Sequence, residues 1–225
     1  EVKSSHQIDG SAIYFEDGMF YNNTVTNNTG ISAMCTKGWY DGAVVRIYNT
    51  IIYKNTNSSG KDCKAISQAG FIVQIDHCMF SESSKCDPST STDYVKVTSM
   101  VTGDPSFKNP SPSDGSMPDY SLNKESKAIN AGTDILMQLY DEGDSKLNLP
   151  SYDANYDARV QDCTVDIGAY EFNGAYSITP DETTSADKAV YYVTQNGRGT
   201  GSAANPENAA CWTKLQKVLD AAGRY

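Results

Sequence analysis

Basic residues are scarce in this chain. Its 225 residues include 18 Lys and Arg against 28 Asp and Glu, which gives a formal net charge of −10. Nucleic acids and anionic membrane surfaces attract proteins that carry an excess of positive charge. The charge balance therefore disfavours both as partners of this protein.

Long apolar stretches are missing as well. No run approaches the roughly 20 apolar residues that a membrane-spanning helix needs, so we expect no membrane insertion. Hydrophobic residues nevertheless make up 39% of the chain, and 15 Tyr add aromatic surface. This apolar content predicts a folded protein and disfavours disorder throughout.

Metal-binding patterns are not evident either. The 6 Cys include no CxxC pair, only 2 His are present, and the spacing matches no zinc motif. The acidic side chains considered as Ca²⁺ ligands are Asp134, Asp141, Glu142 and Asp144, or Asp153 and Asp157. Neither set follows the EF-hand pattern, and we interpret them as solvated acids, so no cofactor is predicted.

What the sequence does contain is an internal repeat. Three segments of alternating apolar and polar residues share a turn position, which is occupied by Asn23, Asn49 and His77. The steps between these residues are 26 and 28 (49 − 23 = 26; 77 − 49 = 28). Repeats of this length, built of short strands without a helical period, fit the coils of a parallel β-helix. We therefore predict an all-β solenoid of parallel strands.

Equivalent residues of neighbouring coils should stack about 4.8 Å apart in such a solenoid. The predicted columns are Asn23, Asn49 and His77 at the turn, and Tyr21, Ile47, Ile75 and Thr24, Thr50, Cys78 in the interior. A functional His77 would be a catalytic base or a ligand. Because no partner constellation accompanies it, we interpret it as a column member that replaces Asn.

Two cysteines follow the same spacing. Cys35 and Cys63 are 28 residues apart (63 − 35 = 28), which predicts that they lie beside each other on adjacent coils. A Cα separation of about 4.8 Å is within the range of a disulfide. We expect either a disulfide between coils or a stacked pair of thiols. A further pairing, of Cys78 with Cys86 across a loop, has less support.

Beyond residue 100 the repeat gives way to short motifs. They are Asp104-Pro105-Ser106-Phe107, Asp119-Tyr120-Ser121-Leu122, Ser126 to Gly132, and Asp166 to Glu171. Their order resembles the C-terminal end of pectate-lyase-like right-handed β-helix proteins of secreted and surface-exposed bacterial type, although Lys127 replaces a usual Pro. The resemblance implies a right-handed, single-stranded parallel β-helix at the cell surface or outside the cell. It implies no particular chemistry, because that family mixes polysaccharide lyases, hydrolases and modules without known activity.

Charged residues gather in this closing region. The cluster consists of Asp157, Arg159, Asp166 and Glu171. We expect Arg159 to pair with Asp166 or Glu171, where charges and irregular loops blunt the open edge of the stack. This interpretation is structural and not catalytic.

The end of the chain indicates a second domain. Residues 173–188 are a polar linker, which separates the coils and closing segment, 1–172, from a strand and an amphipathic helix in 189–225. Asn205 and Pro206 predict the start of that helix, and Gly223 its end.

The last segment also resembles the N-terminal cap of the same β-helix family. The chain would then close one β-helix and begin another. One chain's tail would cap another chain's head, giving head-to-tail self-association, or the same contacts would join neighbouring β-helix domains of a longer protein.

The leading functional prediction is a non-catalytic repeat module of a large secreted or cell-surface bacterial protein. Such a module would be an adhesin, a stalk, part of a filament or a surface that contacts carbohydrate. The aromatic residues considered for stacking on a surface polysaccharide are Trp39, Tyr40, Tyr48 and Tyr53. Packing within the fold is the more ordinary role for all of them.

The alternative prediction is an enzyme. A polysaccharide lyase or glycoside hydrolase of the pectate-lyase-like fold would have its catalytic coils partly outside this segment. The candidates on the visible coils are Arg46, Lys54, Asp76 and His77, which form no recognisable catalytic set. The sequence thus assigns no catalytic residue, and a module without activity is favoured.

Overall fold

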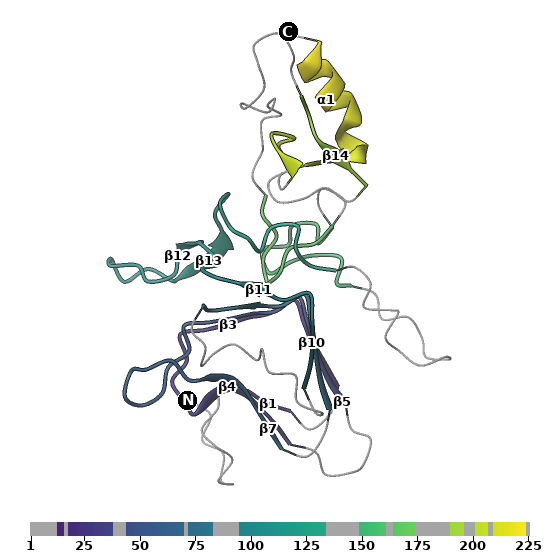
Figure 1. Cartoon of the computed structure of the whole chain (residues 1–225). Coiled ribbons are helices and arrows are strands. Elements are labelled where there is room, and N and C mark those ends of the chain that lie inside the picture. Colours follow the sequence, from purple (N-terminus) through teal and green to yellow (C-terminus); the bar gives the residue numbers. More distant parts are fainter. Residues whose placement is uncertain are drawn as a thin grey trace. The chain divides into compact units, whose positions relative to one another are not determined.

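Strands dominate the protein. A computed structural model of the chain describes residues 13–15, 18–37, 44–69, 72–82, 95–133, 149–160, 164–173, 190–195, 201–206 and 209–223. These residues form mostly parallel β-sheets with one short α-helix, as predicted for an all-β chain (Figure 1). The chain divides into a first unit, Glu1–Pro105 with Ile167–Ala169, and a second unit, Ser106–Asp166 with Tyr170–Tyr225.

The first unit contains three parallel sheets. The first sheet consists of β1 (Ile13–Phe15), β4 (Ser32–Lys37) and β7 (Lys64–Ala69); the second of β2 (Gly18–Tyr21), β5 (Val44–Tyr48), β8 (Ile72–Asp76) and β10 (Val95–Thr98); the third of β3 (Thr24–Thr26), β6 (Ile51–Tyr53), β9 (Met79–Phe80) and β11 (Val101–Thr102). Consecutive strands enter different sheets. Strands that are neighbours in space therefore come from successive repeats.

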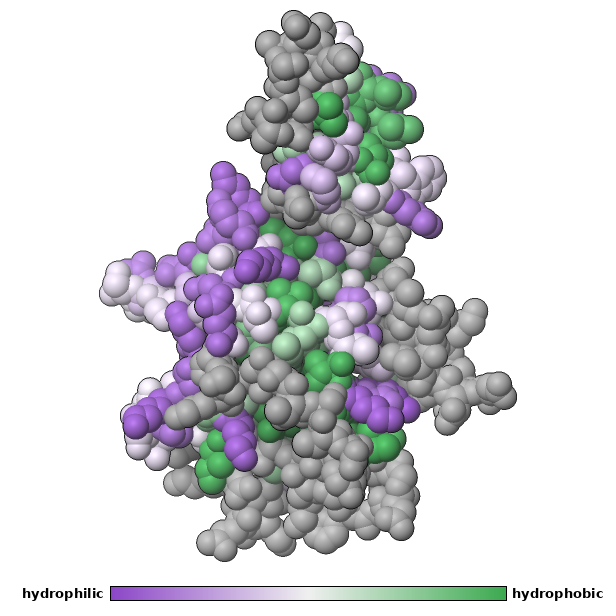
Figure 2. Space-filling model, viewed as in Figure 1, coloured by the Kyte–Doolittle hydropathy of each residue, from purple (hydrophilic) through white to green (hydrophobic). Residues whose placement is uncertain are grey.

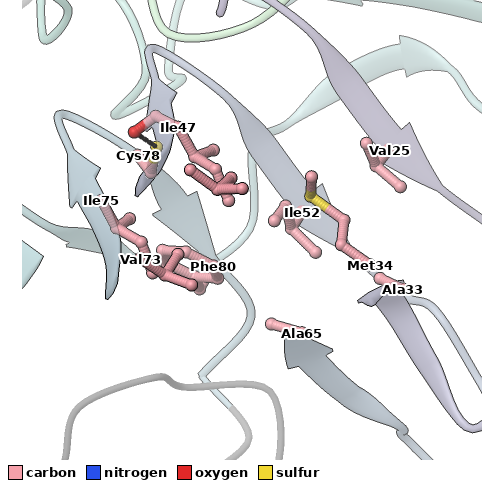
Figure 3. Close-up of a cluster of buried hydrophobic side chains, with 11 residues drawn as sticks. Val25, Ala33, Met34, Ile47, Ile52, Ala65, Val73, Ile75, Cys78 and Phe80 are labelled. Atoms are coloured by element: carbon pink, nitrogen blue, oxygen red, sulfur yellow. Dashed lines mark hydrogen bonds between the residues drawn. The ribbon is translucent and has the colours of Figure 1, made fainter. Parts of the chain in front are cut away.

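The three sheets share one apolar core. Along β5 the side chains of Val45 and Ile47 are buried, whereas Val44 and Arg46 are partly exposed, as expected for a strand with one buried face. The buried members of the core are Val25, Ala33, Met34, Val45, Ile47, Ile52, Ala65, Val73, Ile75, Cys78 and Phe80 (Figure 3). Every sheet contributes to this cluster, so none of the three can bury its apolar face alone.

The register confirms one predicted step and corrects the other. Val45 pairs with Val73, a step of 28 residues (73 − 45 = 28), as predicted. Gly18 pairs with Val45, so the preceding step is 27 (45 − 18 = 27) and not 26. A shift of one residue moves each side chain of a strand to the opposite face of the sheet. The first repeat is therefore arranged differently from the prediction.

The turn column contains Asn22 in place of Asn23. Its members have the left-handed backbone conformation, with φ values of 53° at Asn22, 44° at Asn49, 47° at His77 and 47° at Ser99. Asn tolerates this conformation better than most residues. His77 thus occupies a backbone position that Asn fills in the two preceding repeats.

The interior ladders shift accordingly. Phe20, and not Tyr21, pairs with Ile47 and packs against the core, while Tyr21 pairs with Tyr48. The prediction that Thr24 lies beside Thr50 is likewise wrong, because Thr24 pairs with Ile51.

The residues that follow the turn column have a common hydrogen bond. Asn23 Nδ2, Thr50 Oγ1 and Cys78 Sγ each donate to the carbonyl oxygen two residues earlier, at 2.6, 2.7 and 3.3 Å. The thiol of Cys78 also lies 3.5 Å from the carbonyl oxygen of Ile47 (Figure 3). These bonds satisfy backbone acceptors where the strands are interrupted.

The predicted pairing of Cys35 with Cys63 is wrong in both of its forms. Cys35 pairs in register with Ser67, a step of 32 residues (67 − 35 = 32), and no disulfide joins the two cysteines. The reason is the long connection 54–63 between β6 and β7, which displaces Cys63 along the strand direction. Cys78 is also a buried thiol, so its pairing with Cys86 is not formed. Cys211 is disulfide-bonded.

A pair of asparagines links two repeats at a position that sequence analysis missed. Asn55 is 2% exposed, and its Nδ2 donates to the carbonyl oxygen of Val25 at 2.9 Å. Its Oδ1 accepts hydrogen bonds from the backbone N–H of Asn28 at 3.1 Å and from Asn28 Nδ2 at 2.9 Å. The signal in the sequence is a 27-residue step between two Asn-Thr pairs (55 − 28 = 27).

Residues Ile167–Ala169 pack against the third sheet within the first unit. The backbone N–H of Gly168 donates to the carbonyl oxygen of Asn49 at 2.8 Å, and that of Ala169 to Thr24 Oγ1 at 3.2 Å. Gly168 has a φ of 116°, and a Cβ there would lie 2.8 Å from Ile51 Cδ1. Glycine is required at this close approach. Because Ile52 belongs to the core, Ile51 and this segment lie on the opposite face of the sheet.

The second unit has shorter regular elements. Its strands are β12 (Phe107–Asn109), antiparallel to β13 (Asp119–Leu122), and β14 (Val193–Thr194), parallel to β15 (Ala210–Cys211). The 3₁₀ turn Trp212–Lys214 leads into α1 (Leu215–Ala222), which ends at Gly223 as predicted. The predicted helix start at Asn205 is wrong, because β15 lies between that residue and α1. No helix among the described residues is long and apolar enough to cross a membrane.

Candidate functional site

Four ionisable side chains are buried together in the second unit. Asp153, Arg159, Asp166 and Glu171 are 7%, 4%, 3% and 3% exposed. Arg159 Nη1 donates to Glu171 Oε1 at 3.1 Å, which is one of the two pairings expected from the sequence. Asp157 contributes its backbone N–H, which donates to Asp153 Oδ1 at 2.9 Å. Asp153 was missed as a member of this cluster, which we call the buried ionic cluster.

The buried ionic cluster joins segments that are distant in sequence. Asp166 Oδ1 accepts from the backbone N–H of Asn130 at 2.7 Å, and Glu171 Oε2 from that of Asp166 at 2.9 Å. Asp153 Oδ2 accepts from the backbone N–H of Glu171 at 2.7 Å. Carboxylates thus replace the backbone acceptors that a regular sheet would provide.

Glu171 has the chemical character of a general acid but not the accessibility. Burial and the neighbouring Asp166 carboxylate raise its pKa to about 9, against the opposing effect of Arg159. Raised carboxyl pKa values often mark active sites. Here both oxygens are engaged by Arg159 and the Asp166 backbone, and the side chain is 1% exposed. The cluster therefore supports the fold and does not reach a substrate.

The acidic side chains considered as calcium ligands form no cation site among the described residues. Both carboxylate oxygens of Asp153 are occupied by backbone N–H groups, so this residue is not available to a cation. Asp134, Asp141, Glu142 and Asp144 lie outside the described residues. Within the described part of the chain, no group of three or more His, Cys, Asp or Glu side chains is placed to hold a metal ion.

An acid–base pair lies at the end of strand β8 in the first unit. His77 Nδ1 is 2.9 Å from Asp76 Oδ1, and the two side chains are 30% and 18% exposed. Burial raises the pKa of Asp76, but the hydrogen bonds and charge of His77, with a hydrogen bond from Thr98, outweigh it and hold that pKa below its usual range. The Asp76 carboxylate thus lies within ion-pair distance of the imidazole of His77.

The surroundings of this pair come from the same sheet. Arg46 pairs in register with Gln74, and Tyr48 with Asp76. Lys54, another candidate, instead holds its Nζ 5.1 Å from the centroid of the Tyr53 ring. The structure therefore brings Arg46, Asp76 and His77 onto neighbouring strands and leaves Lys54 apart from them.

The aromatic residues considered for sugar stacking are mostly engaged. Tyr48 is fully buried, so its predicted role on the surface is wrong. The hydroxyl of Tyr53 hydrogen-bonds to Asp104, and Lys54 lies over its ring. Trp39 and Tyr40 lie outside the described residues.

Exposed apolar side chains gather at the C-terminal end of the second unit. Trp212, Leu215 and Leu219 are 59%, 46% and 53% exposed, whereas Val218 is 4% exposed and packs against Ala203 and Ala210. Figure 2 shows hydrophobic side chains at the surface of the region that contains α1. Among the described residues of the second unit, none covers this apolar face of α1.

No protein-family model matches the chain, and no curated protein and no solved structure matches it.

Proposed function

We propose that the chain is a segment of a right-handed parallel β-helix that serves as a non-catalytic module of a large secreted or cell-surface bacterial protein. The observation that carries this proposal is the common register of the second and third parallel sheets. The second and third sheets repeat in steps of 27 and then 28 residues from β2 and β3 through to β8 and β9. A chain that enters three sheets in rotation and returns beside itself follows a solenoid, and parallel crossovers are right-handed in almost all proteins.

An exported location has separate support. Cys211 is disulfide-bonded, and disulfides persist mainly in oxidising environments outside the cytosol. The order of the DPxF, DYxL and DIGAYE motifs adds the resemblance to secreted and surface-exposed bacterial β-helices. A net charge of −10 suits a soluble surface protein.

The positions of the charged residues favour a role without catalysis. The buried ionic cluster is engaged by the backbone, and His77 fills a turn position that is Asn in the preceding repeats. The alternative, a polysaccharide lyase or glycoside hydrolase, is supported by the Asp76–His77 pair near Arg46.

An activity screen separates these two functions. The purified chain is incubated with polygalacturonate, alginate and hyaluronan, with and without Ca²⁺, and both unsaturated products and new reducing ends are measured. We expect no turnover. The matched variant is His77→Asn, which should keep the fold because Asn tolerates the left-handed turn. Turnover by the natural chain that this variant loses would replace our proposal with the enzyme.

We further propose the predicted domain arrangement. Residues 1–172 complete one β-helix, residues 189–225 cap a neighbouring β-helix, and the linker 173–188 connects the two. The exposed Trp212, Leu215 and Leu219 would cover the apolar end of that neighbour, which in solution is a second copy in head-to-tail contact. Apolar surface of this kind is buried in stable interfaces.

Light scattering after size exclusion tests this association. The mass of the natural chain should rise with concentration, and the triple variant Trp212→Ser, Leu215→Ser, Leu219→Ser should stay monomeric. Met117→Ser is the control, because Met117 is 88% exposed in the same unit but distant in sequence from α1. A natural chain that is monomeric at every concentration contradicts the head-to-tail proposal.

A further inference from the structure

We propose that Tyr152 and Tyr156 form a binding platform for a neutral polysaccharide. Neither residue was singled out by the sequence. The inference rests on the proposed function, because a surface module is where a polysaccharide would be encountered, and it assigns the carbohydrate contact to a loop of the second unit.

The two tyrosines lie on a tight hairpin. The backbone N–H of Arg159 donates to the carbonyl oxygen of Ser151 at 3.0 Å, and Tyr152 forms an antiparallel bridge with Ala158. The backbone N–H of Asp153 donates to the carbonyl oxygen of Asp157 at 2.8 Å. Residues 154–156 are left as a three-residue loop.

The loop is held in one conformation by a buried side chain. Asp153 Oδ1 accepts hydrogen bonds from the backbone N–H groups of Asn155, at 2.8 Å, and Asp157, at 2.9 Å. The backbone N–H of Tyr156 donates to the carbonyl oxygen of Asp153 at 3.1 Å. Asp153 itself is anchored through the backbone N–H of Glu171. A loop fixed before binding loses little conformational entropy when it binds.

Tyr156 occupies a backbone position that disfavours a bulky residue. Its φ is 65°, the left-handed conformation that closes three-residue hairpin loops and is normally filled by Gly. A bulky residue is strained there, and such strain is often kept at binding sites. The Tyr156 side chain is 86% exposed, and within the described residues no hydrogen bond or ring contact engages its phenol.

The surface around the tyrosines indicates a neutral ligand. Tyr152 is 59% exposed, the exposed polar neighbours, Ser151 and Asn155, are uncharged, and Asp153 and Arg159 are buried. The one other charged neighbour in 151–160, Asp157, is half-buried and would repel an anionic ligand. Aromatic rings pack on the apolar faces of sugars, and amide and hydroxyl groups bond to their hydroxyls. The net charge of −10 repels anionic polysaccharides.

Affinity electrophoresis of the full chain in native gels tests this platform. The gels contain dextran, galactomannan, xyloglucan or arabinoxylan as neutral probes, and polygalacturonate as the anionic comparison. We expect at least one neutral probe to retard the natural chain. The double variant Tyr152→Ala, Tyr156→Gly should bind that probe about tenfold more weakly or worse, which corresponds to ~1.4 kcal/mol.

The single variant Tyr156→Gly keeps the test independent of folding. Glycine adopts the left-handed conformation freely, so this variant should unfold at the same temperature as the natural chain or higher, yet bind the probe more weakly. Met117→Ala is the control and should be retarded like the natural chain. A natural chain that no neutral probe retards, retardation by polygalacturonate alone, or a double variant that binds as the natural chain does would each overturn the proposal. These outcomes leave the activity screen and the light-scattering test unaffected, because those depend on His77 and on the face of α1.

Discussion

The two units satisfy their backbones in different ways. In the first unit, parallel ladders repeat from strand to strand, and the polar side chains that enter the interior serve carbonyl groups at the turns. In the second unit, the described sheets have two strands each, and carboxylates accept the N–H groups that have no strand partner. Repetition spreads stability over many similar bonds, whereas the irregular unit concentrates it in few residues. Mutations should therefore act more locally and more severely in the second unit.

The largest effect is expected at Arg159. Replacing it with Ala removes the buried guanidinium that donates to Glu171 Oε1, and removing one partner of a buried charged contact typically costs about 3–5 kcal/mol of unfolding free energy. Urea unfolding measures this loss. The control is Lys124→Ala, because the Lys124–Glu125 pair is 73% and 65% exposed and should contribute less than about 1 kcal/mol. Equal losses of unfolding free energy in the two variants would show that the buried pair stabilises the protein no more than the exposed pair does.

A smaller effect is expected in the first unit, at Gly168. A Cβ there meets Ile51 Cδ1 at 2.8 Å and also strains a φ of 116°, so Gly168→Ala should lower the unfolding free energy by about 1–3 kcal/mol. Gly18→Ala is a matched control, because Gly18 has a φ of 119° and open space where its Cβ would stand. The difference between the two variants isolates the packing of 167–169 from backbone strain. If both lose the same amount, the close contact with Ile51 has no energetic importance.

The most gradual effect is the pH dependence of the second unit. The folded-state pKa of Glu171, about 9, lies above its ordinary value of 4.5, so the folded protein retains a proton that the unfolded chain releases. The resulting stabilisation is complete below about pH 4.5 and is lost as the pH rises towards 9. Urea unfolding at several pH values should show this decline, and Glu171→Gln should flatten it. An unchanged slope in the variant would mean that other groups cause the dependence.

Sequence patterns predict the repeating part well because periodic residues face equivalent surroundings. The alternation at Val45 and Ile47, the 28-residue step and the parallel strands all follow from it. The error at Asn23 arose because two adjacent asparagines fit the turn equally in sequence. Only the positive φ of Asn22 distinguishes them.

The remaining errors have tertiary causes. The connection 54–63 between β6 and β7 is longer than the connection 27–31 between β3 and β4. The spacing of Cys35 and Cys63 equals the 28-residue repeat step and therefore concealed this difference. Local capping signals at Asn205 were overridden because Ala210–Cys211 pairs with β14. Asp153 could have been found from the Asn and Asp that follow it at two and four positions, a pattern typical of turns closed by a side chain.

The placement of Ile167–Ala169 in the first unit bears on how the protein is made. Ile51 is synthesised 116 residues before Ile167 (167 − 51 = 116), so the ribosome has translated all of that intervening chain before the cover of Ile51 emerges. During that interval the face of the third sheet that carries Ile51 is exposed to solvent. A sheet that can form early therefore depends on residues synthesised much later for its cover.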